Sequence, residues 1–289
     1  MALPERPSAE GPSAEGPSTE GPDVRRAIEH MVPAQFDLAK MMLTTKVDGK
    51  LRRRYGEAGS FTYPPEERGR FPMITIAQDP EHEFVGAANL KDPQNPDIPL
   101  LPYYANLRGG IPEDYEVMAR ALAEKVEASG IPFDYITGIP DSGNAIAKAL
   151  AEILGSPCYE VLEKTGEGSD RKFKLRTFKE DEARPEVGMK ALVVDDLITK
   201  KTTKDEAEAE LVRNGFGVSG HAVVYDREEG GMEDMRDEGR NIVAGLTATQ
   251  LFAVALLMGK VSGEVYDTIM GKINDGKRAR SLKRTQNNA

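Results

Sequence analysis

Apolar residues recur along the chain with two different spacings, and each spacing predicts a different kind of element. Between Pro112 and Ser129 they return every three or four positions, which predicts a helix with a proline in its first turn. The further helices predicted in this way lie at residues 24–46, with a break near Pro33, 145–154 and 204–213. The stretch that follows the first of these helices, up to about Arg70, is rich in Gly, Pro and Arg and has no assigned element.

Short apolar runs predict strands. They are FPMITIAQ (71–78), EFVGAANL (83–90), FDYITGI (133–139), PCYEVLE (157–163), ALVVDD (191–196) and VSGHAVVYD (218–226). A turn at Asp79 and Pro80 is predicted to join the first two, and 164–188 is a polar segment. Alternation of strands with helices indicates an α/β fold, a parallel sheet with helices on both faces. In such sheets ligands bind beyond the C-terminal ends of the strands.

Two polar loops follow predicted strands and are candidates for a binding site. The loop in TGIPDSGNA leads into a helix N-terminus, a geometry suited to a phosphate group. In ALVVDDLITKKTTK, the adjacent Asp195 and Asp196 end an apolar run and precede another helix. Neighbouring strand residues point to opposite sides, so both carboxylates can serve one site only if a turn starts there. The alternative is that one aspartate forms a turn and the other caps a helix.

Charge and composition narrow the classes of function. The net charge of −10 argues against general affinity for nucleic acid or anionic membranes, so an anionic ligand would need a local basic patch. Cys158 is the only cysteine, which excludes an intrachain disulfide. The N-terminal residues lack the apolar core of a signal peptide, and no apolar run approaches 18 residues. We therefore expect a cytoplasmic protein.

Several common site signatures are absent from the sequence. It contains neither G-x-G-x-x-G nor G-x-x-x-x-G-K-[ST], so dinucleotide binding and Walker-type NTP hydrolysis lose their main support. His30, His82 and His221 lack metal-site spacing. Ser142 lacks the flanking residues of a nucleophile elbow.

The segment ALVVDDLITKKTT resembles the phosphoribosyl-diphosphate (PRPP) motif of type I phosphoribosyltransferases, and the chain is closest to the orotate branch. Four other segments carry the resemblance: IPLLPYYANLRGGI, FDYITGIPDSGNAIAKALA, VVYDREEGGMEDMRDEG and LTATQLFAVAL. The resemblance covers the chain from about Phe84 to Leu257. The resemblance implies a parallel-sheet type I phosphoribosyltransferase fold with a small N-terminal hood. It also implies transfer of the 5-phosphoribosyl group from PRPP to orotate or a related base, in pyrimidine nucleotide synthesis.

Site residues follow from the resemblance by position. Asp195 and Asp196 would contact the ribose hydroxyls and act in catalysis, together with Lys164 of the mobile loop. Arg227 would engage the base. The remaining residues implied for PRPP are Pro140, Asp141, Ser142, Gly143, Thr199, Lys200, Lys201, Thr202 and Thr203; those implied for the base are Thr199, Lys91, Tyr103 and Tyr104. Magnesium is implied as a cofactor held mainly by the substrate, with no metal site from the protein, and a homodimer is implied as the assembly.

Four regions are expected. Residues 7–21 repeat a Pro-, Ser-, Glu- and Gly-rich unit of five, so residues 1–22 should form a disordered tail. Residues 23–110 would hold the N-terminal helix and hood, and 111–275 the phosphoribosyltransferase core. Residues 276–289 form a basic C-terminal tail, which we expect to be frayed and solvated.

Lys200 and Lys201 depart from the family pattern, which has a small residue and a glycine at these positions. A lysine forced into the left-handed conformation would cost roughly 1–2 kcal/mol. Either the two ammonium groups offset this cost beside a phosphate, or the loop takes another shape and both lysines are solvated.

The mobile loop departs further. YEVLEKTGEGSDRKFK keeps Lys164 but has Thr165 where the family has histidine, and Arg171, Lys172 or Lys174 could substitute. Two hypotheses therefore stay open: an orotate phosphoribosyltransferase, or a weakly active or inactive sensor of PRPP or nucleotides with the same fold.

Overall fold

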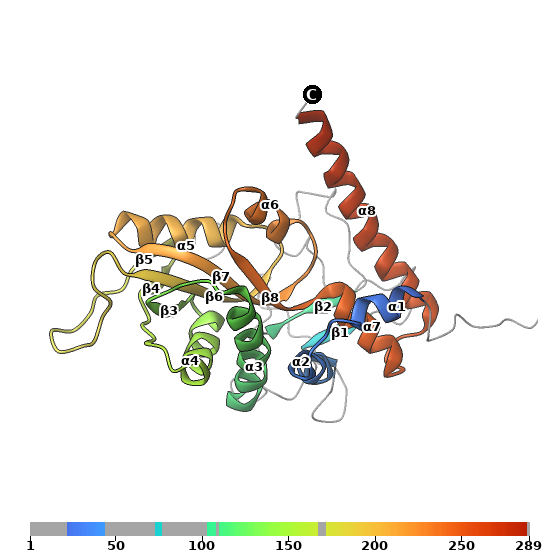
Figure 1. Cartoon of the computed structure of the whole chain (residues 1–289), viewed down its shortest axis with the longest axis horizontal. Coiled ribbons are helices and arrows are strands. Elements are labelled where there is room, and N and C mark those ends of the chain that lie inside the picture. The colour runs from blue at the N-terminus through green and yellow to red at the C-terminus, as the bar shows by residue number, and fades with distance from the viewer. Residues whose placement is uncertain (1–21, 44–72, 77–102, 108–109, 167–171, 288–289) are drawn as a thin grey trace, which may run out of the picture.

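The protein was analysed as a computed structural model, which describes residues 22–43, 73–76, 103–107, 110–166 and 172–287 (Figure 1). Lys91, Arg171, the predicted strand at 83–90 and the whole N-terminal repeat at 7–21 lie outside these residues.

A four-stranded parallel sheet forms the centre of the fold, with the strand order β3-β6-β7-β8. Its strands are β3 (Tyr135–Gly138), β6 (Lys190–Ile198), β7 (Gly217–Asp226) and β8 (Ile242–Thr247). Each pair of neighbouring strands is separated in sequence by a helix, which the parallel connection requires. This arrangement confirms the predicted α/β sheet, and β8 is a strand that apolar runs did not predict.

Helices cover both faces of the sheet (Figure 1). One face packs on α3 (Pro112–Ser129) and α4 (Ser142–Leu154), and the other packs on α5 (Thr202–Arg213). The predicted 112–129 helix is observed with the expected bounds. The other two predicted core helices begin earlier than expected, so that α4 takes in Ser142 and Gly143 from the predicted PDSGN loop.

A smaller group of elements packs beside α3. It consists of α1 (Pro22–Ile28), α2 (Pro33–Leu43), α7 (Ala248–Leu257) and the antiparallel pair β1 (Ile74–Ile76) and β2 (Tyr103–Ala105). The break near Pro33 separates α1 from α2, as predicted. Within this group, the ring of Tyr103 in β2 contacts that of Phe252 in α7, with centroids 4.7 Å apart.

The segment predicted as polar and without an element contains a strand. β5 (Lys172–Leu175) pairs antiparallel with β4 (Leu162–Thr165) and forms a hairpin. Only the end of the predicted 157–163 strand belongs to β4, and Cys158 makes an isolated bridge with Ile136 of β3. Phe173 is buried under the hairpin, which explains why a segment with many charges still forms a strand.

The C-terminal region differs from the prediction of a frayed tail. Instead, α8 (Gly263–Asn287) continues as one helix and projects from the body of the molecule (Figure 1). A short helix, α6 (Gly231–Asp237), stands in the segment expected to be a base-binding loop. Among the described residues, none of the helices combines the length and the apolar character that crossing a bilayer requires.

Candidate active site

Asp195 and Asp196 both lie inside β6, which runs on to Ile198. The turn expected at this pair is therefore wrong, and the strand alternation sends the two carboxylates to opposite faces of the sheet. Asp195 contacts Lys204 of α5, and Asp196 contacts Ser142 at the start of α4. Each aspartate thus anchors the helix that covers its own face of the sheet.

Lys204 forms a buried ion pair with Asp195. Its Nζ lies 2.6 Å from Asp195 Oδ2 and also donates to the carbonyl oxygen of Leu197, and the lysine side chain is 3% exposed. Burial raises the pKa of Asp195 to about 6; Lys204 opposes this shift, and the neighbouring Asp196 adds to it. The positive charge of Lys204 thus compensates the negative charge of Asp195 at the C-terminal end of β6, beneath the loop that follows.

The start of α4 packs closely on the end of β6. Ser142 Oγ donates to Asp196 Oδ2 over 2.7 Å. A Cβ at Gly143 would lie 2.5 Å from the carbonyl oxygen of Val194, so only glycine fits there without a shift. The peptide bond between Pro140 and Asp141 is cis. This packing brings the predicted pyrophosphate loop and the acidic pair together.

The loop from Thr199 to Thr203 does not have the strain that its lysines suggested. Lys201 has φ −77° and ψ −12°, in the right-handed region, and it precedes the first residue of α5. Lys200 Nζ donates to the carbonyl oxygen of Glu229 over 3.0 Å. The expected cost of a left-handed lysine is therefore absent, because the loop takes another shape.

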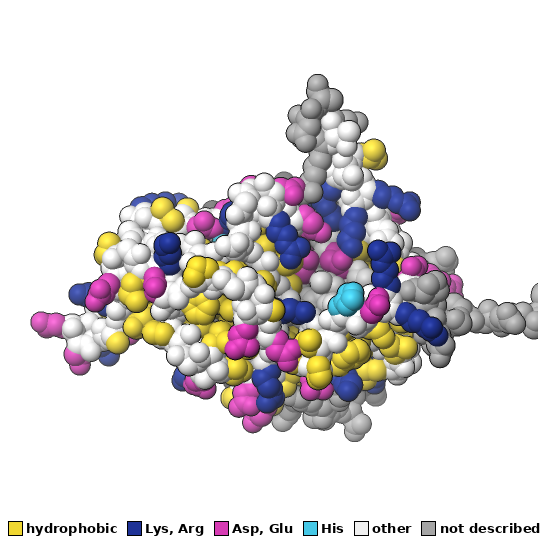
Figure 2. Space-filling view, in the orientation of Figure 1, with side chains coloured by type: hydrophobic (Ala, Val, Ile, Leu, Met, Phe, Trp, Pro, Cys, Tyr) yellow, Lys and Arg dark blue, Asp and Glu magenta, His cyan; other side chains and the backbone are white. Residues whose placement is uncertain are grey.

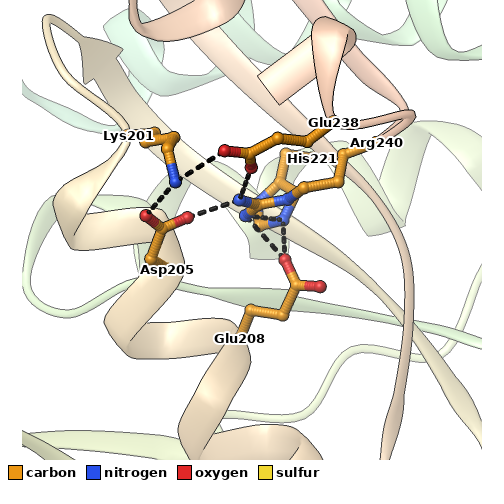
Figure 3. Close-up of polar contacts among 6 residues, drawn as sticks. All are labelled: Lys201, Asp205, Glu208, His221, Glu238 and Arg240. Atoms are coloured by element: carbon orange, nitrogen blue, oxygen red, sulfur yellow. Dashed lines mark hydrogen bonds and ion pairs between the residues drawn. The ribbon is translucent and has the colours of Figure 1, made fainter. Parts of the chain in front are cut away.

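Lys201 belongs to a network of six side chains shown in Figure 3: Lys201, Asp205, Glu208, His221, Glu238 and Arg240. Its Nζ lies 2.8 Å from Asp205 Oδ2 and 2.9 Å from Glu238 Oε1, and hydrogen bonds to these carboxylates raise its pKa. Arg240 bonds to the same two carboxylates. Lys201 is therefore tied to the end of α6 and has partners, although its side chain is still 32% exposed.

Arg227 lies at the end of β7 among aromatic side chains. Its guanidinium carbon is 5.7 Å from the ring centroid of Tyr103, and its Nη2 is 2.8 Å from Glu229 Oε1. Its Nε is buried without a hydrogen-bond partner. The structure thus brings together Arg227 and Tyr103, two residues predicted for the base. For Tyr104, the third such residue in this part of the chain, the structure describes only the backbone, which belongs to β2.

Backbone hydrogen bonds join the predicted base loop (residues 227–231) to the predicted phosphate loop (residues 199–203). Gly231 N donates to the carbonyl oxygen of Thr199 over 3.1 Å, and Arg227 N donates to that of Ile198 over the same distance. A Cβ at Gly231 would come within 2.9 Å of the Lys200 backbone. The two loops consequently form one packed unit at the C-terminal edge of the sheet.

Lys164 approaches the same edge from the hairpin. Its Nζ is 3.4 Å from Asp141 Oδ2, next to the predicted pyrophosphate loop. Lys172 and Lys174 belong to the opposite face of the hairpin, because Lys164 pairs in register with the buried Phe173. Their side chains therefore point away from the side on which Lys164 lies. The sequence alone had allowed either of them to replace the missing cations of the mobile loop.

Sequence reasoning missed three cations that contact the site loops. The sequence pattern predicts Lys204 only as the start of a helix. The one available signal is that Lys204 is the lysine in the first turn of a helix otherwise rich in acidic residues. Lys277 and Arg280 of α8 contact Glu228 in the base loop. No local pattern could have paired them with a residue about fifty positions earlier.

Metal ligands are sparse in this part of the molecule. Over the ranges that the structure describes, no group of three or more His, Cys, Asp or Glu side chains is arranged to hold a metal ion.

Comparisons with known proteins agree with this arrangement. Over 143 residues the chain is 31% identical to orotate phosphoribosyltransferase of Saccharolobus solfataricus, in a match that covers 48% of this chain and 67% of that relative. Over 156 residues it is 31% identical to orotate phosphoribosyltransferase of Pyrococcus furiosus, covering 53% of this chain and 81% of the relative. No family model matches the chain.

The fold is also similar to the solved structure of UMP synthase from Leishmania donovani. The TM-score is 0.57 at 17% identity, and the likeness covers 84% of this chain and 42% of that one. The predicted type I fold is thereby confirmed. With 31% identity over most of the Pyrococcus relative, the chain belongs to the orotate phosphoribosyltransferase family of type I phosphoribosyltransferases.

Proposed function

We propose that this protein transfers the 5-phosphoribosyl group from PRPP to orotate or a closely related base, releasing pyrophosphate and a nucleoside monophosphate. The observation that carries the proposal is the junction of the phosphate loop with the base loop through Gly231 and Thr199. A reaction that joins a base to a ribose phosphate needs both subsites at a fixed separation. The pathway served would be pyrimidine nucleotide synthesis.

The phosphate loop supplies an anion site at the N-terminus of α5, where backbone N–H groups and the helix dipole favour negative charge. Asp195 and Asp196 lie immediately before it. The carboxylate of Asp196, on the Ser142 side of the sheet, would favour the positive charge that develops on the ribose as pyrophosphate leaves. Lys204 keeps Asp195 from standing as an uncompensated buried anion while PRPP is absent.

On the base side, Arg227 offers a planar donor group against the ring of Tyr103. A guanidinium of this kind suits a carboxylate or paired carbonyl oxygens, which orotate carries. Arg227 forms an ion pair with Glu229. The substrate carboxylate would therefore have to replace Glu229 or share the guanidinium group with it. The buried Nε of Arg227, which lacks a partner, is a further donor for the base.

We propose magnesium as the cofactor. Hard oxygen donors suit this ion, which keeps several waters and binds substrate phosphates through few protein ligands. The residues fit that mode because Asp141, 79% exposed at its side chain, is the carboxylate at the mouth of the pyrophosphate loop. When bound, the ion would neutralise pyrophosphate charge, while Lys164 beside Asp141 would stabilise the departing group.

The experiment that tests the proposal is an absorbance assay for loss of orotate with PRPP and magnesium. Omission of magnesium, and uracil in place of orotate, are the controls. We expect orotate loss with release of pyrophosphate. Sedimentation would test the proposed homodimer in the same preparation.

A second candidate is a sensor that binds PRPP or a nucleotide with little turnover. One observation favours it: Lys164 is the only cation of the described hairpin that points towards the pyrophosphate loop. Tight PRPP binding by calorimetry, with no loss of orotate, adenine or uracil, would support this candidate instead.

A further inference from the structure

Helix α8 contacts the base loop, although about fifty residues separate them in sequence. Lys277 Nζ lies 2.6 Å from Glu228 Oε1, and Arg280 Nη2 donates to the carbonyl oxygen of Glu228 over 2.9 Å. Figure 2 shows Lys and Arg side chains gathered along this helix. These contacts place two cations of α8 one residue beyond Arg227.

Glu228 is held in an uncommon conformation. Its φ is +56°, in the left-handed region that a non-glycine residue seldom adopts, and the residue is 9% exposed. Its N–H donates to Asp226 Oδ1 over 2.8 Å, and its Oε2 accepts from Thr249 N at the start of α7. A backbone in this region persists only where surrounding contacts hold it. Lys277 and Arg280 supply those that come from α8.

Arg280 also packs on the backbone of the loop. Gly230 has φ +103°, and a Cβ there would come within 2.5 Å of Arg280 Cδ. The stem of Arg280 therefore lies directly over Gly230. Since Gly231 bonds to Thr199 on the other side, the base loop is fixed between the phosphate loop and α8.

The local charge explains why the contacts from α8 are basic. The base loop and its surroundings carry Asp226, Glu228, Glu229 and Glu233, against the two cations Arg227 and Arg236. An anionic base would be repelled by this surplus of carboxylates. Two cations on α8 offset it without entering the base site.

We propose that Lys277 and Arg280 are positioning residues: they hold the loop that carries Arg227, and thereby set the affinity for the base without touching it. The kinetic part of this proposal rests on the proposed function, whereas its structural part does not. The C-terminal helix is thus a part of the base site that the sequence presents only as a basic tail.

Hydrogen–deuterium exchange tests the structural part on the full chain. The variant Lys277→Met with Arg280→Met keeps an alkyl stem at both positions, including the one over Gly230, and removes both charges. We expect the amides of Glu228 and Gly231 to exchange about tenfold faster, because their local opening becomes easier, while those of β6 stay unchanged. The matched control is Arg278→Met, which removes an exposed arginine of the same helix.

The kinetic part uses the same variants. The double variant should raise the KM for orotate by about three- to tenfold, the effect of losing one half-buried ion pair and one hydrogen bond from a charged group, with kcat and PRPP affinity unchanged. If the charge at position 277 is what matters, Lys277→Arg should have the wild-type KM for orotate. Should the double variant fold poorly, the single variant Lys277→Met provides a milder substitution.

Equal exchange at Glu228 and Gly231 in the double variant and in Arg278→Met would overturn the proposal. So would a matching loss of PRPP affinity, because that indicates a general disturbance of the fold. If the wild-type protein shows no turnover, the proposed function fails, and the exchange result still decides the role of α8.

Discussion

Lys204 Nζ and Asp195 Oδ2 lie 2.6 Å apart at the C-terminal end of β6, in a pair with almost no contact with solvent. The lysine comes from the first turn of α5, and the aspartate comes from the strand that precedes the phosphate loop. Loop 199–203 therefore lies in sequence between the two partners of one ion pair. The geometry of this loop depends on their remaining together.

Replacing Lys204 with methionine should destabilise the protein strongly. The substitution leaves Asp195 buried without its partner, which typically costs about 3–5 kcal/mol. Urea unfolding at pH 7 would measure the change. Lys148→Met, at an exposed lysine of α4, is the matched control and should leave the midpoint unchanged. A small effect of Lys204→Met at pH 7 would mean that Asp195 accepts burial in its protonated form.

Asp226 should make stability fall as the pH rises through the acidic range. Burial raises its pKa to about 7, with Glu233 and Glu228 adding to the shift, while the N–H of Glu228 and the charge of Arg236 oppose it. Between pH 4 and this value the folded state binds more protons than the unfolded state, so each pH unit costs about 1.36 kcal/mol from this group.

Asp226→Asn should flatten this part of the stability profile, because the amide keeps the oxygen that accepts from Glu228 N and does not titrate. Chemical denaturation at several values between pH 4 and 7 would measure it. An identical slope in wild type and variant would show that Asp226 ionises normally. Asp134→Asn, at a carboxylate whose Oδ2 accepts from a backbone N–H on an exposed edge, is the control.

Arg227→Ala should act on the base and leave PRPP binding within a few fold. Removing a buried charged contact typically costs about 2–5 kcal/mol of binding. Steady-state kinetics would give the KM for orotate, and calorimetry the affinity for PRPP. Arg213→Ala, at an exposed arginine of α5, should change neither. If both ligands weaken equally in Arg227→Ala, the arginine is structural.

Lys164→Ala should lower turnover by about 10²-fold, the usual loss when one positioned donor to a developing charge is removed. The control is Lys174→Ala, on the other face of the hairpin and paired with Glu163. Rapid quench of pyrophosphate release would separate chemistry from product release. Fast turnover in Lys164→Ala would assign the role to another cation.

The sequence predicted the parallel sheet and its main helices well, because their apolar positions repeat with clear periods. The helix at 112–129 was predicted with its observed bounds, since a proline begins it and a glycine follows it. Element ends near the site were less predictable. Asp195 and Asp196 look like the end of a strand, but both are buried and bonded, so β6 continues through them.

The partners of the site residues could not be predicted, because tertiary contacts decide them. Nothing near Lys200 or Lys201 in sequence indicates that they reach Glu229 and Glu238. The β4–β5 hairpin was hidden by its charges, since only Phe173 and Leu162 supply its buried side. The basic composition of the C-terminal region predicts a frayed end. The region is helical instead, and its ion pair with Glu228 holds it against the body of the molecule.

The hydrogen bond between Gly231 and Thr199 joins main-chain atoms, so the direct link between the two predicted subsites is made without a side chain. We expect the spacing between the subsites to survive most substitutions in either loop. A single inhibitor that joins a phosphate mimic to a base mimic should then need one particular linker length, which would serve for side-chain variants of the protein as well.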